Sequence, residues 1–185
     1  MYIELTDGEI VLNPFKVSDK KQWLRVRALN RDWLAPWDST VPQSSDAGGK
    51  IPATFRKMIK NQRREARAGR AYTFAIRKGP NLIGQITLGG VVYGALRGAH
   101  IGYWIDREYS NRGYITSAVN MITDFAFNEL ELHRIEINIR PENQPSIRVA
   151  EKCGYLFEGE RPRFLHIDGA WRDHLCYVKE NLAIK

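Results

Sequence analysis

The feature that most constrains the fold is a junction between residues 101 and 118. An apolar, strand-like run, Ile101–Ile105, leads into a short polar loop that contains Asn111 and Gly113, and a helical pattern begins directly after it. Asn and Gly adopt left-handed backbone conformations more easily than other residues. A helix that begins there directs unpaired backbone N–H groups at whatever lies in front of it. The junction therefore predicts a binding site for an anion.

Two common phosphate-binding loops are excluded. No Lys-Ser or Lys-Thr pair follows Gly113, so the loop is not that of a nucleoside-triphosphate site. The second and third glycines of a dinucleotide-binding turn are also missing.

Length and composition predict one α/β domain over residues 1–185. Cys153 and Cys176 are the only cysteines and form neither a disulfide framework nor a metal-binding spacing, which favours a reducing compartment. Acidic residues near the start argue against a signal peptide, and no apolar run approaches the roughly 20 residues of a membrane span. We therefore expect a soluble, cytoplasmic protein with no membrane contact and no bound metal.

Positive charge is concentrated in one predicted helix. The net charge of the chain is +7, and the segment Arg56–Arg70 holds seven basic residues against one acid, Glu65. One interpretation is a solvated helix face. The alternatives are docking on RNA, on an acidic protein or close to an anionic cofactor. No aromatic residues alternate with these bases, which argues against a platform for single-stranded nucleic acid.

The hydrophobic pattern predicts the element order βααβββαβαββ. Turn residues and alternation place the strands at Val11–Phe15, Ala71–Ile76, Leu82–Val92, Ala99–Ile105, Arg134–Ile139, Tyr155–Phe164 and Trp171–Glu180. Two helices are expected before residue 70, one of them the basic helix, and two more at Ile115–Leu130 and from Pro145 to Cys153. Trp33–Trp37 is expected to be an apolar loop, and Asp38–Pro52 a mobile connection.

This order and four motifs resemble the GNAT superfamily of acetyl-CoA-dependent N-acetyltransferases, in particular its RimJ/RimL branch of ribosomal-protein N-terminal acetyltransferases. The resemblance covers the chain from about Val11 to Tyr177. Its most specific parts are Ile101–Trp104, Asn111–Thr116, Arg140–Ser146 and Glu151–Gly159, and the closing Trp171–His174 also fits.

The resemblance implies an α+β fold, a three-layer α/β arrangement with a mixed, mostly antiparallel sheet of six to seven strands and four flanking helices. In this fold the fourth and fifth strands splay apart and admit the pantetheine arm of acetyl-CoA, which pairs with main chain near Tyr103, Trp104 and Ile105. The pyrophosphate loop reads Ser110-Asn111-Arg112-Gly113-Tyr114-Ile115, against the family pattern Gln/Arg-x-x-Gly-x-Gly/Ala. Ser110 and Ile115 depart from that pattern, but the loop binds through main-chain N–H groups. The implied cofactor-binding residues are Tyr103, Trp104, Ile105, Asn111, Arg112, Gly113, Tyr114, Ile115, Thr116 and Asn143.

Acyl transfer from a thioester to an amine needs a deprotonated nucleophile, a hydrogen-bond donor for the developing oxyanion and a proton source for the leaving thiolate. The resemblance places Asn143 and Ser146 beside the sulfur of the cofactor, with Ser146 as the acid. Asn143 ends a strand and loop, and Ser146 falls in the first turn of the next helix. The alternative interpretation is that Asn143 only caps this helix and Ser146 only stabilises its first turn.

The general base is harder to assign. Several relatives use a carboxylate of the fourth strand, and His100 stands at the corresponding place, just before Ile101-Gly102. A histidine near its ordinary pKa suits the task, although a lone histidine on a strand is more often structural. Glu158 is expected either to shape the site or to pair with arginines. In the last hairpin, His166, Asp168 and His174 are expected near the entrance for the acceptor, which would also be lined by the Trp33–Trp37 and Asp38–Pro52 segments.

The chemistry of the acceptor favours an N-terminal α-amine. Such an amine has a pKa of about 7.8 and a lysine amine about 10.4, a difference of roughly 3.5 kcal/mol in deprotonation at neutral pH. An enzyme with a weak base therefore suits α-amines. We expect transfer of acetyl to the N-terminus of a protein, here a ribosomal protein, with RNA contacts through Arg56–Arg70. Acetylation of a polyamine or aminoglycoside, or a non-catalytic acyl-CoA- or RNA-binding module, are the alternatives, and monomer and homodimer both stay open.

Overall fold

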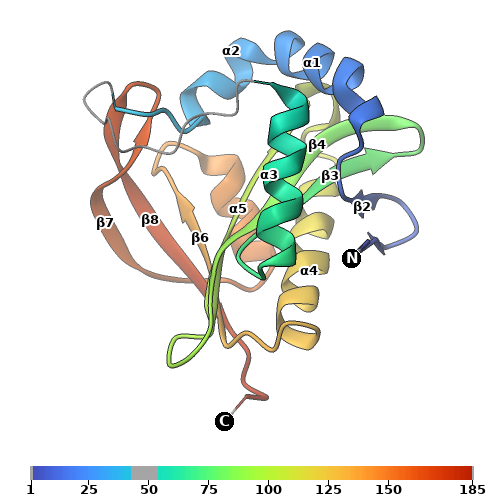
Figure 1. The fold of residues 1–185 in the computed structure, drawn as a ribbon. Helices are drawn as coiled ribbons and strands as arrows, with labels where there is room; N and C mark the ends of the chain where they lie inside the picture. Colours follow the sequence, from blue (N-terminus) through green and yellow to red (C-terminus); the bar gives the residue numbers. More distant parts are fainter. Residues whose placement is uncertain (1, 43–53, 185) are drawn as a thin grey trace.

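The computed structural model describes residues 2–42 and 54–184, and its strands form one sheet in the order β1-β2-β3-β4-β5-β6-β8-β7. The strands are β1 (Leu5–Thr6), β2 (Val11–Asn13), β3 (Tyr72–Lys78), β4 (Asn81–Val92), β5 (Gly98–Ile105), β6 (Arg134–Ile139), β7 (Leu156–Ile167) and β8 (Ala170–Glu180). The helices are α1 (Lys20–Leu29), α2 (Arg31–Leu34), α3 (Phe55–Arg67), α4 (Tyr114–Asn128) and α5 (Gln144–Lys152), with short 3-10 turns η1 (Val17–Asp19), η2 (Ala35–Trp37) and η3 (Arg107–Tyr109). Figure 1 shows their arrangement.

The predicted mixed, mostly antiparallel sheet is confirmed: all neighbouring strands pair antiparallel except β5 and β6, which are parallel. The sheet has one strand more than predicted, because Leu5 and Thr6 pair with Leu12 and Val11. The segment Trp33–Trp37 is not the loop that its composition predicted. It completes α2 and forms η2, so it continues the helical layer after α1.

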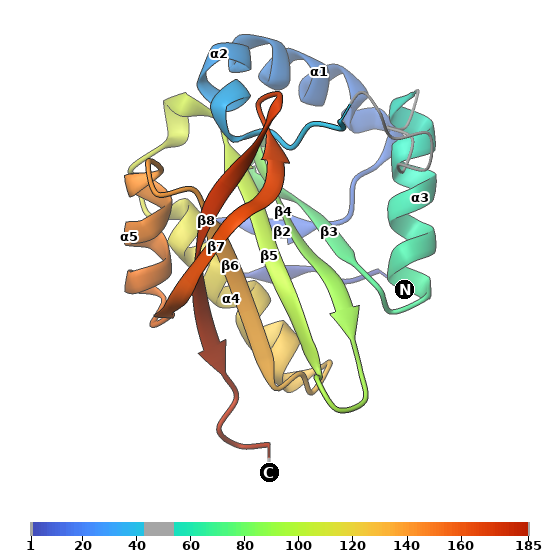
Figure 2. The same ribbon diagram turned by 90° about the vertical axis from the view of Figure 1, so that its left-hand side faces the viewer.

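The sheet buries apolar side chains on both faces. Alternation along β3 sends Phe74 and Ile76 to a large core beneath α4 and α5, while Ala75 meets a smaller core with Phe55 and Ile59 of α3. Figure 2 shows α3 and α4 on opposite sides of the sheet. Helix α3 is therefore held to the body by one apolar stripe, and its remaining faces are open. None of the helices in the described ranges is long and apolar enough to cross a membrane.

The parallel strands β5 and β6, which are the fourth and fifth strands of the predicted order, separate after a short paired segment, as the resemblance implied. Strands β5 and β6 pair at Gly98↔Arg134, Ala99↔Ile135 and His100↔Glu136, and the register ends there. Beyond it, β5 continues to Ile105 along β4, while β6 continues to Ile139 along β8. The opening between the two strands is the place where a site can form.

Candidate active site

Two cavities meet at the splay of β5 and β6. The first, of about 280 Å³, extends from the splay to the start of α4, and the second, of about 440 Å³, extends toward β7 and β8. Six of the described residues line both cavities: Leu34, Trp37, Tyr103, Trp104, Asn143 and Ser146. Both residues that the sequence assigned to chemistry beside the sulfur therefore lie at the junction.

The start of α4 offers a row of backbone donors to the first cavity. Gly113 has a left-handed conformation (φ 85°) and is the N-cap of α4, with no side chain capping the helix. Among the described residues, no acceptor is recorded for the backbone N–H groups of residues 111–116. A Cβ on Gly113 would touch no protein atom, so any side chain there would extend into open space next to this cavity.

Cationic side chains surround these free donors. Arg112 lines the cavity from the loop, and Arg148 and Lys152 line it from α5. Arg112 was predicted from the sequence, whereas Arg148 and Lys152 were not. The available signal was their spacing of four residues, which puts both side chains on one face of a helix. Free N–H groups, a helix N-terminus and three cations fit a diphosphate group.

The strand segment predicted to hold an extended ligand lies between the cavities. Beyond His100, β5 has no strand partner on the side that faces β6, although β4 pairs with its other side to Ile105. The carbonyl of Ile105 already accepts a hydrogen bond from Trp33 Nε1 (3.3 Å). Tyr103 and Trp104 line both cavities, whereas Ile105 lines the first alone.

At the junction, Asn143 and Ser146 adopt the arrangement expected of a helix start. Asn143 is the N-cap of α5, and its Oδ1 accepts a hydrogen bond from the Ser146 backbone N–H (3.2 Å). This bond uses the Ser146 backbone N–H and the Asn143 Oδ1, so the Ser146 hydroxyl, which faces the Tyr103 side chain, takes no part in the cap. The capping role and a catalytic role are thus compatible, because capping uses the Ser146 main chain alone.

A buried hydroxyl at the same place lacks a partner. Tyr103 Oη is buried and makes no hydrogen bond of normal geometry within the described residues. Burial raises the pKa of Tyr103, and the Ser146 side chain that faces this hydroxyl counteracts the effect. A buried hydroxyl without a hydrogen bond of good geometry is costly, so a polar ligand atom at the junction would satisfy Tyr103 Oη better than the Ser146 side chain does alone.

His100 lines the second cavity and lies against two glycines of β4. A Cβ on Gly90 would stand 2.8 Å from the imidazole Cε1, and one on Gly89 3.0 Å from Nε2. Only residues without a side chain leave room for the ring at this bulge. His100 as a whole is exposed, yet the partial desolvation of its imidazole lowers its pKa, although the neighbouring Glu136 carboxylate acts to raise it. The imidazole is therefore held neutral near pH 7 and is able to accept a proton.

Glu136, which the sequence analysis did not single out, lines the same cavity from β6. Its carboxylate accepts hydrogen bonds from Arg161 (2.7 Å) and Arg134 (3.1 Å). Burial acts to raise the pKa of Glu136, but these two arginines outweigh it and keep that pKa below its usual value. Glu136 lies beside His100 because β5 and β6 pair there. Its place in the site therefore could not be predicted before the strand pairing was known.

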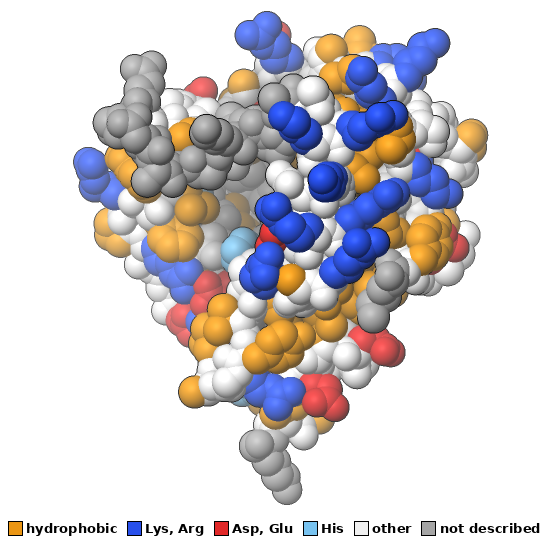
Figure 3. Space-filling view, in the orientation of Figure 1, with side chains coloured by type: hydrophobic (Ala, Val, Ile, Leu, Met, Phe, Trp, Pro, Cys, Tyr) orange, Lys and Arg blue, Asp and Glu red, His pale blue; other side chains and the backbone are white. Residues whose placement is uncertain are grey.

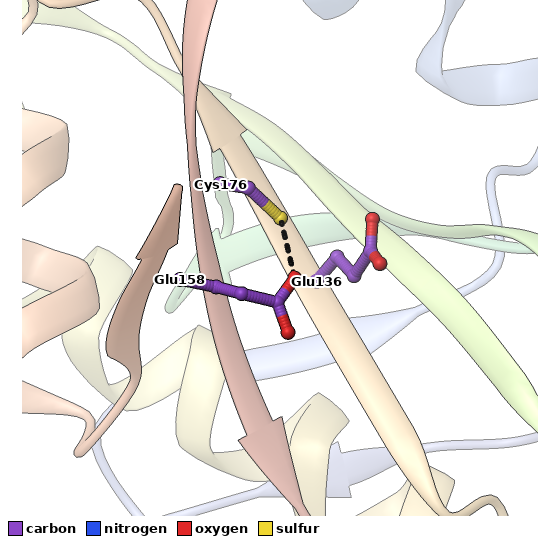
Figure 4. A group of neighbouring side chains, drawn as sticks. All are labelled: Glu136, Glu158 and Cys176. Carbon is purple, nitrogen blue, oxygen red and sulfur yellow. Dashed lines mark hydrogen bonds between the residues drawn. The ribbon is translucent and has the colours of Figure 1, made fainter. Parts of the chain in front are cut away.

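The group of Glu136, Glu158 and Cys176, drawn in Figure 4, has metal-ligand atoms close together. Arg134 pairs with Glu158 (2.5 Å) as well as with Glu136, which confirms the expectation that Glu158 pairs with arginines. Burial raises the pKa of the Cys176 thiol to about 11, so it stays protonated. The guanidinium groups of Arg134 and Arg161 already pair with the carboxylates of Glu136 and Glu158. The cluster is therefore an ion-pair network at the wall of the second cavity.

The Trp33–Trp37 segment covers the splay from above and is attached to both strands. Trp33 donates to the Ile105 carbonyl of β5. From the end of β6, Arg140 Nη1 donates to the Pro36 carbonyl (2.6 Å), and its guanidinium lies 5.4 Å from the Trp37 ring centroid. We call residues 33–37 the roof.

Asp38, next to the roof, lines the second cavity and pairs with Arg27 (2.5 Å). The 43–52 part of the Asp38–Pro52 segment lies outside the described residues.

The final hairpin closes the second cavity on its far side. Ser39 bridges to Ile167, and the Thr40 N–H donates to the His166 carbonyl (2.9 Å). His166 thus contacts Thr40, and Asp168 donates its N–H to the Asp38 carbonyl (3.1 Å).

Of the hairpin residues expected near the acceptor, only His174 lines the cavity. It is 3 % exposed, its Nδ1 lies 3.0 Å from the Arg172 carbonyl, and burial lowers its pKa.

Comparison with known proteins agrees with this geometry. The chain is 34 % identical over 167 residues to the probable N-acetyltransferase YjcK of Bacillus subtilis, covering 89 % of this chain and 90 % of that protein. The structure of Mycobacterium smegmatis RimJ in complex with CoA-disulfide superposes with a TM-score of 0.86 at 34 % identity, covering 99 % of this chain and 88 % of the other. Ribosomal-protein-S5-alanine acetyltransferase from Vibrio fischeri superposes with a TM-score of 0.85 at 28 % identity, covering 99 % of each chain.

The family profile described as the acetyltransferase (GNAT) domain matches residues 9–156, which include the junction before α4, the splayed strands and α5. The fold, the splay and the free helix N-terminus are those that the resemblance implied. This chain belongs to the GNAT family of N-acetyltransferases.

Proposed function

We propose that this protein transfers the acetyl group of acetyl-CoA to the N-terminal α-amine of a protein, and that the natural acceptor is a ribosomal protein. Two similar proteins bear on this: RimJ of M. smegmatis, solved with CoA-disulfide, and the S5-alanine acetyltransferase of V. fischeri. The acetyl-CoA diphosphate would bind the N–H groups of residues 111–116 with Arg112, Arg148 and Lys152, and the thioester would reach the junction. Acetyl-CoA supplies the activated acyl group.

The observation that carries the choice of acceptor is the neutralised second cavity. Both carboxylates that line it are engaged, Asp38 by Arg27 and Glu136 by Arg161 and Arg134. Among the residues that the structure describes, the lining of this cavity thus offers no unpaired carboxylate to a polyamine or an aminoglycoside, and His100 is its neutral base. A base of that strength suits an amine whose pKa is about 7.8 far better than a lysine amine near 10.4.

The positions of the residues around the junction support the following proposed roles. His100 accepts the proton of the attacking amine in the second cavity. The Asn143 Nδ2 donates a hydrogen bond to the oxygen of the carbonyl under attack. The Ser146 hydroxyl, with Tyr103 Oη behind it, provides the proton for the departing sulfur. The roof and the final hairpin exclude water from this reaction and limit the space around the first residue of the acceptor.

The test is a panel of acceptors incubated with purified protein and acetyl-CoA at pH 7, read by mass shift and fragment mass spectra. We expect peptides that begin with Ala, Ser or Thr to gain one acetyl group on the α-amine. The matched control is the same peptide with a blocked N-terminus and an internal lysine, which should remain unmodified. Faster acetylation of spermidine, of an aminoglycoside or of the lysine side chain would replace the proposal with the small-amine or lysine alternative. An inert panel would support a binding module instead.

A further inference from the structure

Helix α3 has a stripe of cations that the proposed reaction does not use. Arg56, Lys60, Arg63 and Arg67 repeat at intervals of four, three and four residues, and all four are exposed. Residues at this spacing lie on one face of a helix. Figure 3 shows Lys and Arg side chains gathered over α3. We call these four residues the basic stripe.

The basic stripe has no anionic partner within the described residues. The single acid of α3, Glu65, pairs with Arg70 (2.8 Å) and Arg64 (3.2 Å), neither of which belongs to the stripe. No ion pair is recorded for the four stripe residues in the described ranges. Their mutual repulsion is therefore uncompensated in the free protein. An external polyanion would relieve it.

The character of the surface favours a polyphosphate over an acidic protein. Protein interfaces have an apolar centre with aromatic or aliphatic anchors. On α3, the large apolar side chains Phe55 and Ile59 are turned into the smaller core and are buried. The exposed side chains of α3 itself are all basic, and Arg63 and Arg67 also border a cavity of about 380 Å³ whose lining includes Ile3. Three of the four stripe residues are arginine, whose planar guanidinium matches phosphate oxygens in pairs.

The length of the stripe suits a double-stranded nucleic acid. Helix α3 has 13 residues and is therefore about 20 Å long. Each strand of a duplex carries a charge about every 3.4 Å along the axis, so such a helix runs beside about six phosphates of one strand. Within α3 no exposed aromatic residue stands between the stripe cations to stack on unpaired bases, although the exposed Tyr2 lines a cavity together with Arg63 and Arg67.

We propose that the basic stripe of α3 binds the phosphate backbone of double-stranded RNA and holds the enzyme beside its acceptor. This deepens the proposed function, on which it rests for the choice of RNA over DNA, since a ribosomal protein lies among folded RNA. Binding is electrostatic and independent of base sequence. The stripe is a docking site, separate from both cavities of the active site.

The experiment measures binding of a fluorescent 20-base-pair RNA duplex by anisotropy between 50 and 200 mM salt. The test variant replaces all four stripe residues by Ser. The control variant replaces Lys20, Lys21, Arg25 and Arg31, which removes the same number of exposed charges from α1 and α2. We expect the test variant to bind at least about tenfold more weakly at 50 mM salt, with a slope of log K against log salt that is shallower by roughly three to four. The control should keep most of the wild-type slope.

Three results would overturn the proposal. Equal loss in both variants means that net charge alone attracts the duplex, and unchanged binding in the test variant places the contact elsewhere. A poly-glutamate peptide of equal charge that displaces the duplex at equal concentration points to an acidic protein instead. Thermal melts of both variants verify that each is folded.

Acetylation of a free Ala-first peptide by the test variant separates this proposal from the proposed function. If the test variant acetylates the free peptide at the wild-type rate but has lost RNA binding, the result supports both the docking site and the proposed function. RNA binding by the wild type without any peptide acetylation leaves the docking site standing and removes the proposed acceptor.

Discussion

The side chain of Ser146 is free because the cap of α5 uses only its backbone N–H. The catalytic role that we propose for Ser146 and its role in the cap therefore use different atoms of one residue. The same holds for the neighbouring Tyr103, whose ring packs against the large core while its hydroxyl reaches the junction of the cavities. Substitutions that remove only these hydroxyl groups should separate activity from stability.

Replacing Ser146 by Ala should lower kcat by about 10- to 1000-fold, the range expected when a positioned acid is lost. Acetyl-CoA affinity and thermal stability should stay close to wild type, because the hydrogen bond to Asn143 Oδ1 remains. Steady-state kinetics, calorimetry and a thermal melt measure the three quantities. A variant with wild-type kcat would leave Ser146 with its helix-start role alone.

His100 should give the pH profile its acid limb. Burial lowers its pKa below the ordinary value of 6.5, so the imidazole loses its base function only as pH falls through that lowered pKa. His100→Gln should reduce kcat/KM by about 100-fold and remove this limb. The titration of the acceptor amine itself, near pH 7.8, should persist in both proteins.

The same shift gives a stability prediction of definite sign. The unfolded chain binds the His100 proton more readily than the folded one, so stability contributed by the neutral ring is present above pH 6.5 and is lost as pH falls below it. In His100→Gln this dependence should be weaker, as measured by urea unfolding at pH 7.5 and pH 5. An identical dependence in both proteins would contradict the assignment.

At the scale of elements, the start of α4 is the part whose function depends most on one backbone conformation. Gly113→Val should abolish acetyl-CoA binding, because a β-branched residue resists positive φ and its side chain would enter the space next to the free N–H groups. Calorimetry on the folded variant measures the affinity.

Gly94 offers a matched control for this substitution. It also has positive φ (73°) with no protein atom within 4 Å of an added Cβ, but it lies in the turn between β4 and β5. Gly94→Val should therefore strain the backbone to a similar degree and leave acetyl-CoA affinity unchanged. Equal loss of affinity in both variants would mean that the effect of Gly113→Val is general destabilisation.

The elements and the cofactor loop were largely predictable from sequence, because they depend on local signals. Alternation marked β6, Pro145 marked the start of α5, and Asn111 with Gly113 marked the loop. The role of Glu136 was not predictable, because it depends on long-range strand pairing with His100. The roof was predicted to be an apolar loop from its composition, but it is helical, and Pro36 fits there because proline is accepted in the first turn of a helical segment.

At the scale of the whole molecule, the first cavity couples ligand binding to folding. A ligand that binds only the folded chain at 100 times its Kd stabilises that chain by about 2.7 kcal/mol. For a chain of this size we expect acetyl-CoA at that concentration to raise Tm by about 5 to 10 °C. The shift should vanish in Gly113→Val and persist in Ser146→Ala, as differential scanning fluorimetry can measure.

The shared boundary of the two cavities sets the order of events in catalysis. Because the two cavities meet at one junction and extend from it in different directions, we expect the donor and the acceptor to bind at the same time, so that neither has to leave before the other arrives. No nucleophile of the protein needs to carry the acetyl group between them. Double-reciprocal plots of initial velocity at several fixed acetyl-CoA concentrations should therefore intersect, as in a ternary-complex mechanism, and not run parallel.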